Sequence, residues 1–242
     1  MMKGTSLLEC DLATGKLSEV ARNYQTQWVT SVALLDRETV VSADAEGNVI
    51  IQKWDTNGVT PEDRRRLSVT GEIRIGEMVN RFRKGPPPPP PSILGTPLTQ
   101  VLLVLYIVNG TYHLLPEHLL PDTPVHPRAY FGTVDGSIYL LGLISPTHTD
   151  LLMKLQANLT HVLKGVGDLD FNRFRAFSSP ERTGDEPFRF VDGDFVERFL
   201  ELGEDAMREV VRPKDATEAE WLGDAWGVEE VRGVLENLRR LH

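Results

Sequence analysis

The apolar pattern of this chain changes its period near Ser145. Before that residue, short runs rich in β-branched residues alternate with Gly, Asp and Asn, which is typical of strands joined by tight turns. After it, leucines recur at the spacing of one face of an amphipathic helix. We therefore predict a mainly β chain with C-terminal α-helices, divided into residues 1–145 and 146–242.

Turn signals join the apolar runs of the first part into hairpins. They lie at Thr14-Gly15, at Ala45-Glu46-Gly47 and at Asp135-Gly136, and Asp-Gly between two apolar runs is a strong hairpin signal. The acidic-Gly turn recurs before a strand, a weak internal repeat of the kind found in propeller blades. About two to three blades fit before Ser145, whereas propellers have roughly four or more. The sequence therefore predicts an incomplete β-propeller.

A proline-rich insertion interrupts the strands between about Gly85 and Pro127. Six consecutive prolines, Pro86 to Pro91, favour polyproline II, which cannot pair in a sheet. Two interpretations remain open for them: a docking ligand for an SH3-like or WW-like module, or a loop between two blade strands. The apolar run from Val101 to Val108 is interpreted as a strand, or as sequence packed against another segment.

Composition and charge narrow the class of partner. The net charge is -9, and it is unevenly distributed. Before Thr147 the sequence has 13 Lys and Arg and 15 Asp and Glu, whereas from Thr147 onward it has 13 Lys and Arg and 20 Asp and Glu. Because phosphate binding needs clustered basic residues, an acidic C-terminal half argues against a nucleic-acid backbone as the main partner. No apolar run approaches the ~20 residues that span a bilayer, and no signal peptide is recognisable. We expect a soluble, intracellular protein without a membrane partner.

Several motifs suggest chemistry, and each has a structural interpretation. Asp192-Gly-Asp194 precedes a helix, so we expect an N-cap rather than an acid–base pair. The run from Gly165 to Asp170 lacks the third glycine of a dinucleotide loop and follows a helix. His113, His118 and His126 show no zinc-ligand spacing, and the one cysteine, Cys10, is expected half-buried in a strand. We predict no enzyme, no cofactor and no metal site.

Aromatic and basic residues interleave between Phe171 and Arg189. Phe171, Phe174 and Phe177 alternate with Arg173 and Arg175. Stacking rings and cations hold single-stranded nucleic acid in some proteins, so direct binding of single strands is one hypothesis. The alternative is that these phenylalanines pack inward beside the acidic helices.

The run ERTGDEPFRFVDGDFVE, from Glu181 to Glu197, carries a family resemblance together with PEDRRRL, GEIRIGEMVNRF and FGTVDGSI. These pieces resemble the C-terminal part of the family of damage-specific DNA-binding protein 1, a three-propeller adaptor of cullin-4 ubiquitin ligases. The family also includes a polyadenylation-factor subunit and a splicing-factor 3b subunit. The resemblance implies a non-catalytic scaffold that completes the third propeller and adds a helical domain.

The resemblance also implies partners and a binding surface. In that family the first and third propellers form a cleft that grips a helical motif of substrate receptors, and Trp28, Met78, Asn80 and Val134 resemble residues of that cleft. Trp28 has a second interpretation as ordinary blade packing. Cullin 4 would be reached only through propellers absent from this chain, and nucleic acid indirectly through receptors, in the nucleus and also the cytoplasm. An RNA-processing scaffold of the same family is the alternative.

Overall fold

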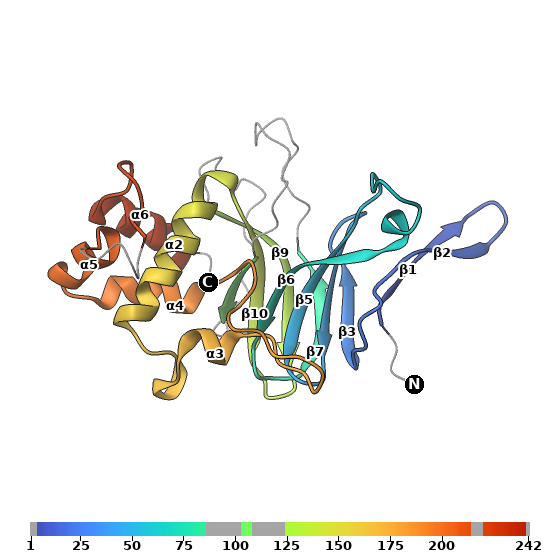
Figure 1. Cartoon of the computed structure of the whole chain (residues 1–242), viewed down its shortest axis with the longest axis horizontal. Helices are drawn as coiled ribbons and strands as arrows, with labels where there is room; N and C mark the ends of the chain where they lie inside the picture. Colours follow the sequence, from blue (N-terminus) through green and yellow to red (C-terminus); the bar gives the residue numbers. More distant parts are fainter. Residues whose placement is uncertain (1–3, 86–102, 108–123, 214–219, 241–242) are drawn as a thin grey trace.

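The computed structural model describes residues 4–85, 103–107, 124–213 and 220–240. Two large β-sheets stand side by side in the middle of the molecule, with the helices at one end of the long axis and a two-stranded ribbon at the other (Figure 1). The ribbon consists of β1 (Ser6–Asp11) and β2 (Lys16–Arg22). It is the predicted Thr14-Gly15 hairpin, in which Gly15 has a φ of +67°.

The first large sheet is a meander of four antiparallel strands in chain order. They are β3 (Val29–Leu34), β4 (Thr39–Asp44), β5 (Asn48–Trp54) and β6 (Leu67–Arg74). The predicted Ala45-Glu46-Gly47 turn joins β4 to β5, and the short 3-10 helix η1 (Asp63–Arg65) lies between β5 and β6. Four antiparallel strands in sequence make one propeller blade.

The second sheet has the strand order β11-β8-β10-β9-β7. Its strands are β7 (Val79–Lys84), β8 (Leu103–Ile107), β9 (Val125–Thr133), β10 (Ile138–Ile144) and β11 (Phe190–Asp192). Residues 103–107 of the insertion therefore form a strand, paired antiparallel with β10, whereas Pro86 to Pro91 lie outside the described residues. β11 comes from the helical part of the chain and pairs parallel with β8.

Each large sheet buries one face against the other. Side chains from both sheets form this core, among them Val41, Val49, Ile51, Phe82, Phe131, Tyr139 and Leu141. Because successive side chains of a strand point to opposite faces, β10 also supplies Leu140 and Ile144 to a second core beneath the helices. Burial on both faces explains why the sequence of β10 is a continuous apolar run rather than an alternating one.

The second core belongs to the C-terminal helices. These are α2 (Pro146–Val162), η2 (Val166–Asp168), α3 (Phe171–Arg175), α4 (Gly193–Glu197), η3 (Arg198–Glu201), α5 (Glu204–Val211) and α6 (Val228–Arg239). The expected inward face of α2 is confirmed for Leu151, Leu152, Leu155 and Leu159, which are buried. Val162 was expected on that face too, but it is exposed at the last residue of the helix.

The predicted fold class is confirmed. The chain is mainly β with helices towards its C-terminus, and its blade-like sheets form an incomplete β-propeller. The described strands do not close into a barrel or a ring. No helix in the described ranges is long and apolar enough to cross a membrane.

Candidate functional site

The four residues singled out by the resemblance lie at one end of the two large sheets. Trp28 immediately precedes β3, Met78 immediately precedes β7, Asn80 is the second residue of β7, and Val134 follows β9. β3 and β7 begin at this end, and β9 finishes there. All four side chains are exposed, Trp28 by 68%, Met78 by 41% and Val134 by 58%. Three large apolar side chains, Trp28, Met78 and Val134, are therefore left in solvent at this end of the two sheets.

Backbone hydrogen bonds join the segments that carry these residues into one row. The Ala45 N–H donates to the Trp28 carbonyl over 3.0 Å, which ties the start of β3 to the β4–β5 turn. The Ile75 N–H donates to the Gly47 carbonyl over 2.8 Å, which ties that turn to the β6–β7 loop. The row closes with a 2.9 Å bond from the Val134 N–H to the Met78 carbonyl. Trp28, Met78, Asn80 and Val134 together are called the blade-end surface below.

This row of hydrogen-bonded segments requires glycine at position 47, in the β4–β5 turn. Gly47 has a φ of +80°, and a Cβ on it would lie 2.9 Å from the backbone nitrogen of Glu77. A side chain there would meet both an unfavourable backbone conformation and a close neighbour that is itself backbone. Gly47 therefore lets the first sheet approach the loop before Met78.

Both strands that carry the blade-end surface are irregular at their first residues. The register of β3 against β4 shifts between Val29 and Ser31. The register of β7 against β9 shifts between Val79 and Arg81, so that Asn80 is the extra residue. A bulge re-aims the side chains beside it and raises the local twist. The two irregularities thus set how the strand starts present their side chains.

Glu77 fastens the β6–β7 loop to the β9–β10 hairpin. Its carboxylate accepts hydrogen bonds from the hydroxyls of Thr133 at 2.6 Å, Tyr139 at 2.8 Å and Ser137 at 3.2 Å. Burial opposes the charged form, but these donors outweigh it and hold the pKa of Glu77 below its usual value. Burial and the bond to Glu77 raise the pKa of the Tyr139 phenol. Met78 follows Glu77 and Val134 follows Thr133 in the chain, so this one carboxylate holds the backbone beside both residues in place.

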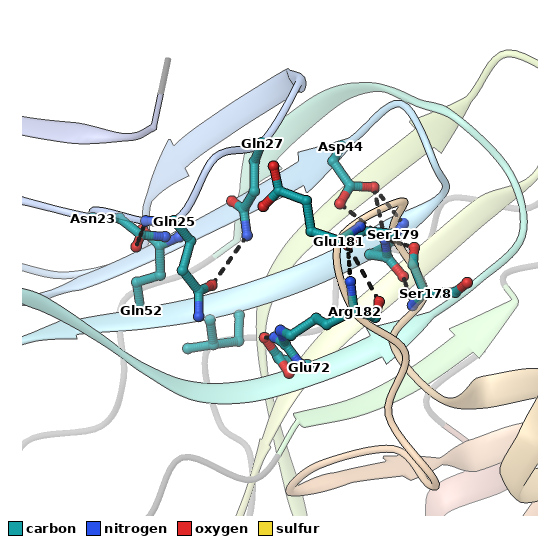
Figure 2. A network of polar contacts seen from close by, with 12 residues as sticks. Asn23, Gln25, Gln27, Asp44, Gln52, Glu72, Ser178, Ser179, Glu181 and Arg182 are labelled. Atoms are coloured by element: carbon teal, nitrogen blue, oxygen red, sulfur yellow. Dashed lines mark hydrogen bonds and ion pairs between the residues drawn. The ribbon is translucent and has the colours of Figure 1, made fainter. Parts of the chain in front are cut away.

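A loop from the helical part supports the first sheet near the same turn. Asn48 donates to the Ser178 carbonyl at 2.8 Å and accepts from the Ser178 N–H at 3.1 Å, while its amide also donates to the Asp44 carboxylate. Figure 2 shows Asp44 close to Ser178 and Ser179 of this loop. Burial raises the pKa of Asp44, partly offset by Asn48. Arg182 of the same loop forms an ion pair with Glu72 of β6.

The hypothesis of a single-strand binding loop between Phe171 and Arg189 does not fit the first part of that range, from Phe171 to Phe177. Arg175 is only 6% exposed and forms an ion pair with Asp192, with Nε and Nη2 each 2.7 Å from Oδ2. Phe171 and Phe177 are buried in the fold. Of the two arginines, Arg173 alone faces solvent. Rings that pack inward and a cation already paired cannot form a stacking platform in this part of the loop, whereas Phe188 and Arg189 at its other end are exposed.

The other residues singled out in the sequence are a cap, a cysteine and three histidines. Asp192 is confirmed as the N-cap of α4, because its carboxylate accepts from the Phe195 N–H at 3.2 Å. Cys10 was expected to be half-buried but is exposed, since the β1–β2 ribbon projects away from both large sheets (Figure 1). His113 and His118 lie outside the described residues, and His126 is buried in β9. In the described ranges no group of His, Cys, Asp and Glu is arranged to hold a metal ion.

The sequence gives no sign that Glu77 and Arg175 hold distant segments together. Glu77 reads as one more surface carboxylate, and Arg175 as one of several basic residues in a loop. Their roles depend on donors 56 to 62 residues away for Glu77 and on a carboxylate 17 residues away for Arg175. Only the folded chain brings those groups together.

The sequence of this chain is similar to those of known proteins. The family model of the CPSF A subunit region matches residues 1–201. DNA damage-binding protein 1a of Arabidopsis thaliana is 32% identical over 244 residues, and DNA damage-binding protein 1 of Solanum lycopersicum is 33% identical over the same length. Each alignment covers 100% of this chain and 19% of the relative. The chain thus spans about a fifth of the length of these curated relatives.

Proposed function

Because this chain belongs to the family of the CPSF A subunit region, we propose that it is a non-catalytic scaffold that docks partner proteins at the blade-end surface. The observation that carries the proposal is a set of exposed apolar side chains on backbone that is fixed by hydrogen bonds. Interface hot spots are large residues in rigid, dry settings, and Trp is prominent among them. We propose Trp28 as the anchor, with Met78 as an adaptable neighbour.

We propose an amphipathic helix as the docked element. A helix that places one apolar stripe on a groove or edge buries anchors at every third to fourth residue. The blade-end surface offers Trp28 and the Met78–Val134 pair as separate apolar points, and Asn80 as an exposed polar group on β7. The partners would be substrate receptors of cullin-4 ubiquitin ligases, with DNA and chromatin reached through them, mainly in the nucleus. Residues 1–145 would then act as the docking part and 146–242 as its helical support.

A defined pair of variants tests this proposal. Trp28→Ala should weaken receptor binding by ~30-fold or more, the value for loss of a hot spot worth about 2 kcal/mol. The thermal midpoint should change little, since the side chain is already in solvent. Tyr24→Ala, which removes an equally exposed aromatic residue four positions earlier, is the matched control and should bind normally. A large fall in the midpoint for Trp28→Ala would mean that Trp28 is packing, and would contradict the proposal.

An RNA-processing scaffold is the second candidate. It is favoured by one observation: the matching family model is named for the CPSF A subunit. The same blade-end surface would then bind subunits of a polyadenylation or splicing complex. Binding of purified receptor proteins by this chain would argue against this candidate, and binding of processing subunits would support it.

A further inference from the structure

An arginine-rich segment leads into the last strand of the first sheet. Residues 64–69 read Arg-Arg-Arg-Leu-Ser-Val, and they pass from η1 into the first residues of β6. The loop that holds η1 projects beside the β1–β2 ribbon (Figure 1). Ser68 has arginines two and three residues before it. This charge pattern is one that basophilic protein kinases read in their substrates.

Two of the three arginines are exposed and free of the fold. The first, Arg64, is engaged: its Nε donates to the Gly58 carbonyl at 2.7 Å, and its own carbonyl accepts from the Trp54 indole N–H at 2.6 Å. Arg65 and Arg66 are exposed, and neither forms an ion pair with a residue that the structure describes. These are the two arginines at the third and second positions before Ser68.

One carboxylate lies near the free arginines, and it is already held. Hydrogen bonds from Thr60, and to a smaller extent the charge of Arg66, lower the pKa of Asp63. The Thr60 N–H donates to the Asp63 carboxylate over 3.2 Å. The guanidinium groups of Arg65 and Arg66 can therefore each form bidentate bonds with a carboxylate of another protein.

Ser68 is accessible on the outer strand of this sheet. Its side chain is exposed, although Leu67 before it is buried. β6 is the last strand of the sheet, and apart from β5 the described chain bridges it only at Arg66 and Glu72. The short helix η1, which carries Arg65, buries none of its three residues. A segment with so few buried contacts opens at low cost, so a kinase can draw it into its active site.

Two cations are placed to hold a phosphate on Ser68. Lys53 of β5 lies directly opposite Ser68 in the register, so the two Cβ atoms are about 5 Å apart on one face of the sheet. Arg66 has extended backbone, with a ψ of +135°, and side chains two residues apart in an extended chain share a face. Phosphoserine carries a charge of about −1.5 to −2 and three acceptor oxygens. Lys53 and Arg66 supply the matching donors.

We propose that Ser68 is a phosphorylation site of a protein kinase that reads Arg65 and Arg66, and that Lys53 and Arg66 then hold the phosphate. The kinase transfers the γ-phosphoryl group of ATP to Ser68. The bond from Ser68 Oγ to the γ-phosphorus forms, and the bond from that phosphorus to the β–γ bridging oxygen breaks. ADP leaves, and the hydroxyl proton passes to the catalytic aspartate of the kinase.

The modification lies away from the blade-end surface. The Ile75 N–H at the end of β6 donates to the Gly47 carbonyl of the β4–β5 turn, which belongs to the row that carries Trp28. The start of β6, with Ser68, therefore lies at the opposite end of the sheet. Phosphorylation adds negative charge beside the ribbon and leaves Trp28 exposed, so it marks a second surface of the chain.

Phosphorylation of the full chain by a purified kinase tests the assignment. The chain is incubated with ATP, Mg²⁺ and the catalytic subunit of cyclic AMP-dependent protein kinase, and the modified residue is identified by peptide mass spectrometry. We expect one phosphate, at Ser68. Ser18, an exposed serine of β2 with no arginine before it, is the internal control and should stay unmodified. Arg65→Ala and Arg66→Ala, both exposed changes, should each lower kcat/KM by about tenfold or more.

A synthetic peptide of residues 61–72 separates the motif from the fold. Phosphorylation of the peptide but not of the folded chain would mean that the fold withholds Ser68, and would overturn the proposal. Modification of Ser18 or of another residue in place of Ser68 would overturn it too. So would an unchanged kcat/KM in the double variant Arg65→Ala with Arg66→Ala.

Phosphorus NMR of the modified chain tests the two holding cations. The second proton of phosphoserine leaves at a pKa of about 6, and nearby cations favour the doubly charged form. The titration midpoint in the folded chain should therefore lie below that of the phosphorylated peptide. Lys53→Gln, which leaves the kinase motif intact, should move the midpoint back towards the peptide value. Equal midpoints in chain and peptide, or no effect of Lys53→Gln, would overturn this placement of the phosphate.

Discussion

Replacement of Arg175 tests how the helical part is attached to the blades. Arg175 lies on α3, and its guanidinium meets Asp192 at the N-terminus of α4, 2.7 Å away. Its Nη1 also lies 3.4 Å from the Arg74 carbonyl and 3.5 Å from the Ile75 carbonyl, at the end of β6. One side chain therefore joins two helices and the first sheet at a position that is almost closed to solvent.

The expected cost follows from burial. Arg175 is 6% exposed and Asp192 is 3% exposed. Arg175→Met keeps most of the side-chain volume but leaves the Asp192 carboxylate buried without its cation. Breaking a buried pair in this way costs about 3–5 kcal/mol. Since a domain is stable by about 5–15 kcal/mol, this one change should remove roughly a fifth or more of the free energy of unfolding.

Urea unfolding followed by tryptophan fluorescence measures that free energy. Arg173→Met is the matched control, because Arg173 is on the same helix but exposed, and it should stay within about 0.5 kcal/mol of the wild type. The double variant Arg175→Met with Asp192→Asn should cost less than the sum of the single variants by about 1–3 kcal/mol. A cost below about 1 kcal/mol for Arg175→Met, or strict additivity, would refute this reasoning.

Three further predictions concern single residues. The pKa of Glu77 is lowered in the fold, so the stabilisation by its carboxylate is present above the ordinary pKa of about 4.3 and is lost as pH falls through the lowered pKa. The difference in urea stability between wild type and Glu77→Gln should therefore close below about pH 4. A difference that stays constant with pH would contradict this. Burial, and to a smaller extent the charge of Arg128, lower the pKa of His126. The unfolded chain therefore takes up a proton at His126 before the folded chain does, as pH falls through about 6.5. The wild type should lose stability in that range relative to His126→Leu, and parallel stability profiles of the two proteins would refute this. Gly47→Ala should destabilise the protein more than Gly15→Ala in thermal unfolding. Both glycines have positive φ, which costs about 1 kcal/mol for alanine at either position, but only at Gly47 does backbone lie against the position of the added Cβ. Equal losses of stability in the two variants would contradict the close approach at Gly47.

Local signals in the sequence were sufficient for most of the strands, for the turns and for one cap, but not for the short strand β11. Gly15, Gly47 and Gly136 all adopt positive φ at the predicted turns, because a turn is decided by a few neighbouring residues. Asp192 likewise reads as an N-cap from the helix that follows it. The pattern of strands then predicts blades, since an antiparallel meander needs only short connections.

The contacts between distant segments were not predictable from those signals. Trp28 and Val134 were placed on one surface only by a family resemblance, and the bonds that join their segments span the two sheets. Arg175 reads as a surface residue because charged side chains are rarely buried unless paired, and its partner lies beyond a long loop. Cys10 was expected to be half-buried because strands usually pack on a sheet, whereas the β1–β2 ribbon stands apart.

Affinity purification with three forms of the tagged chain tests the central proposal most directly. Wild type, Trp28→Ala and Tyr24→Ala would be recovered from cell extract and their bound proteins quantified by mass spectrometry. The account predicts receptor proteins of cullin-4 ligases with wild type and with Tyr24→Ala, and at least about tenfold less of them with Trp28→Ala. Equal recovery of receptors by all three forms, or recovery of splicing and polyadenylation subunits in their place, would contradict it.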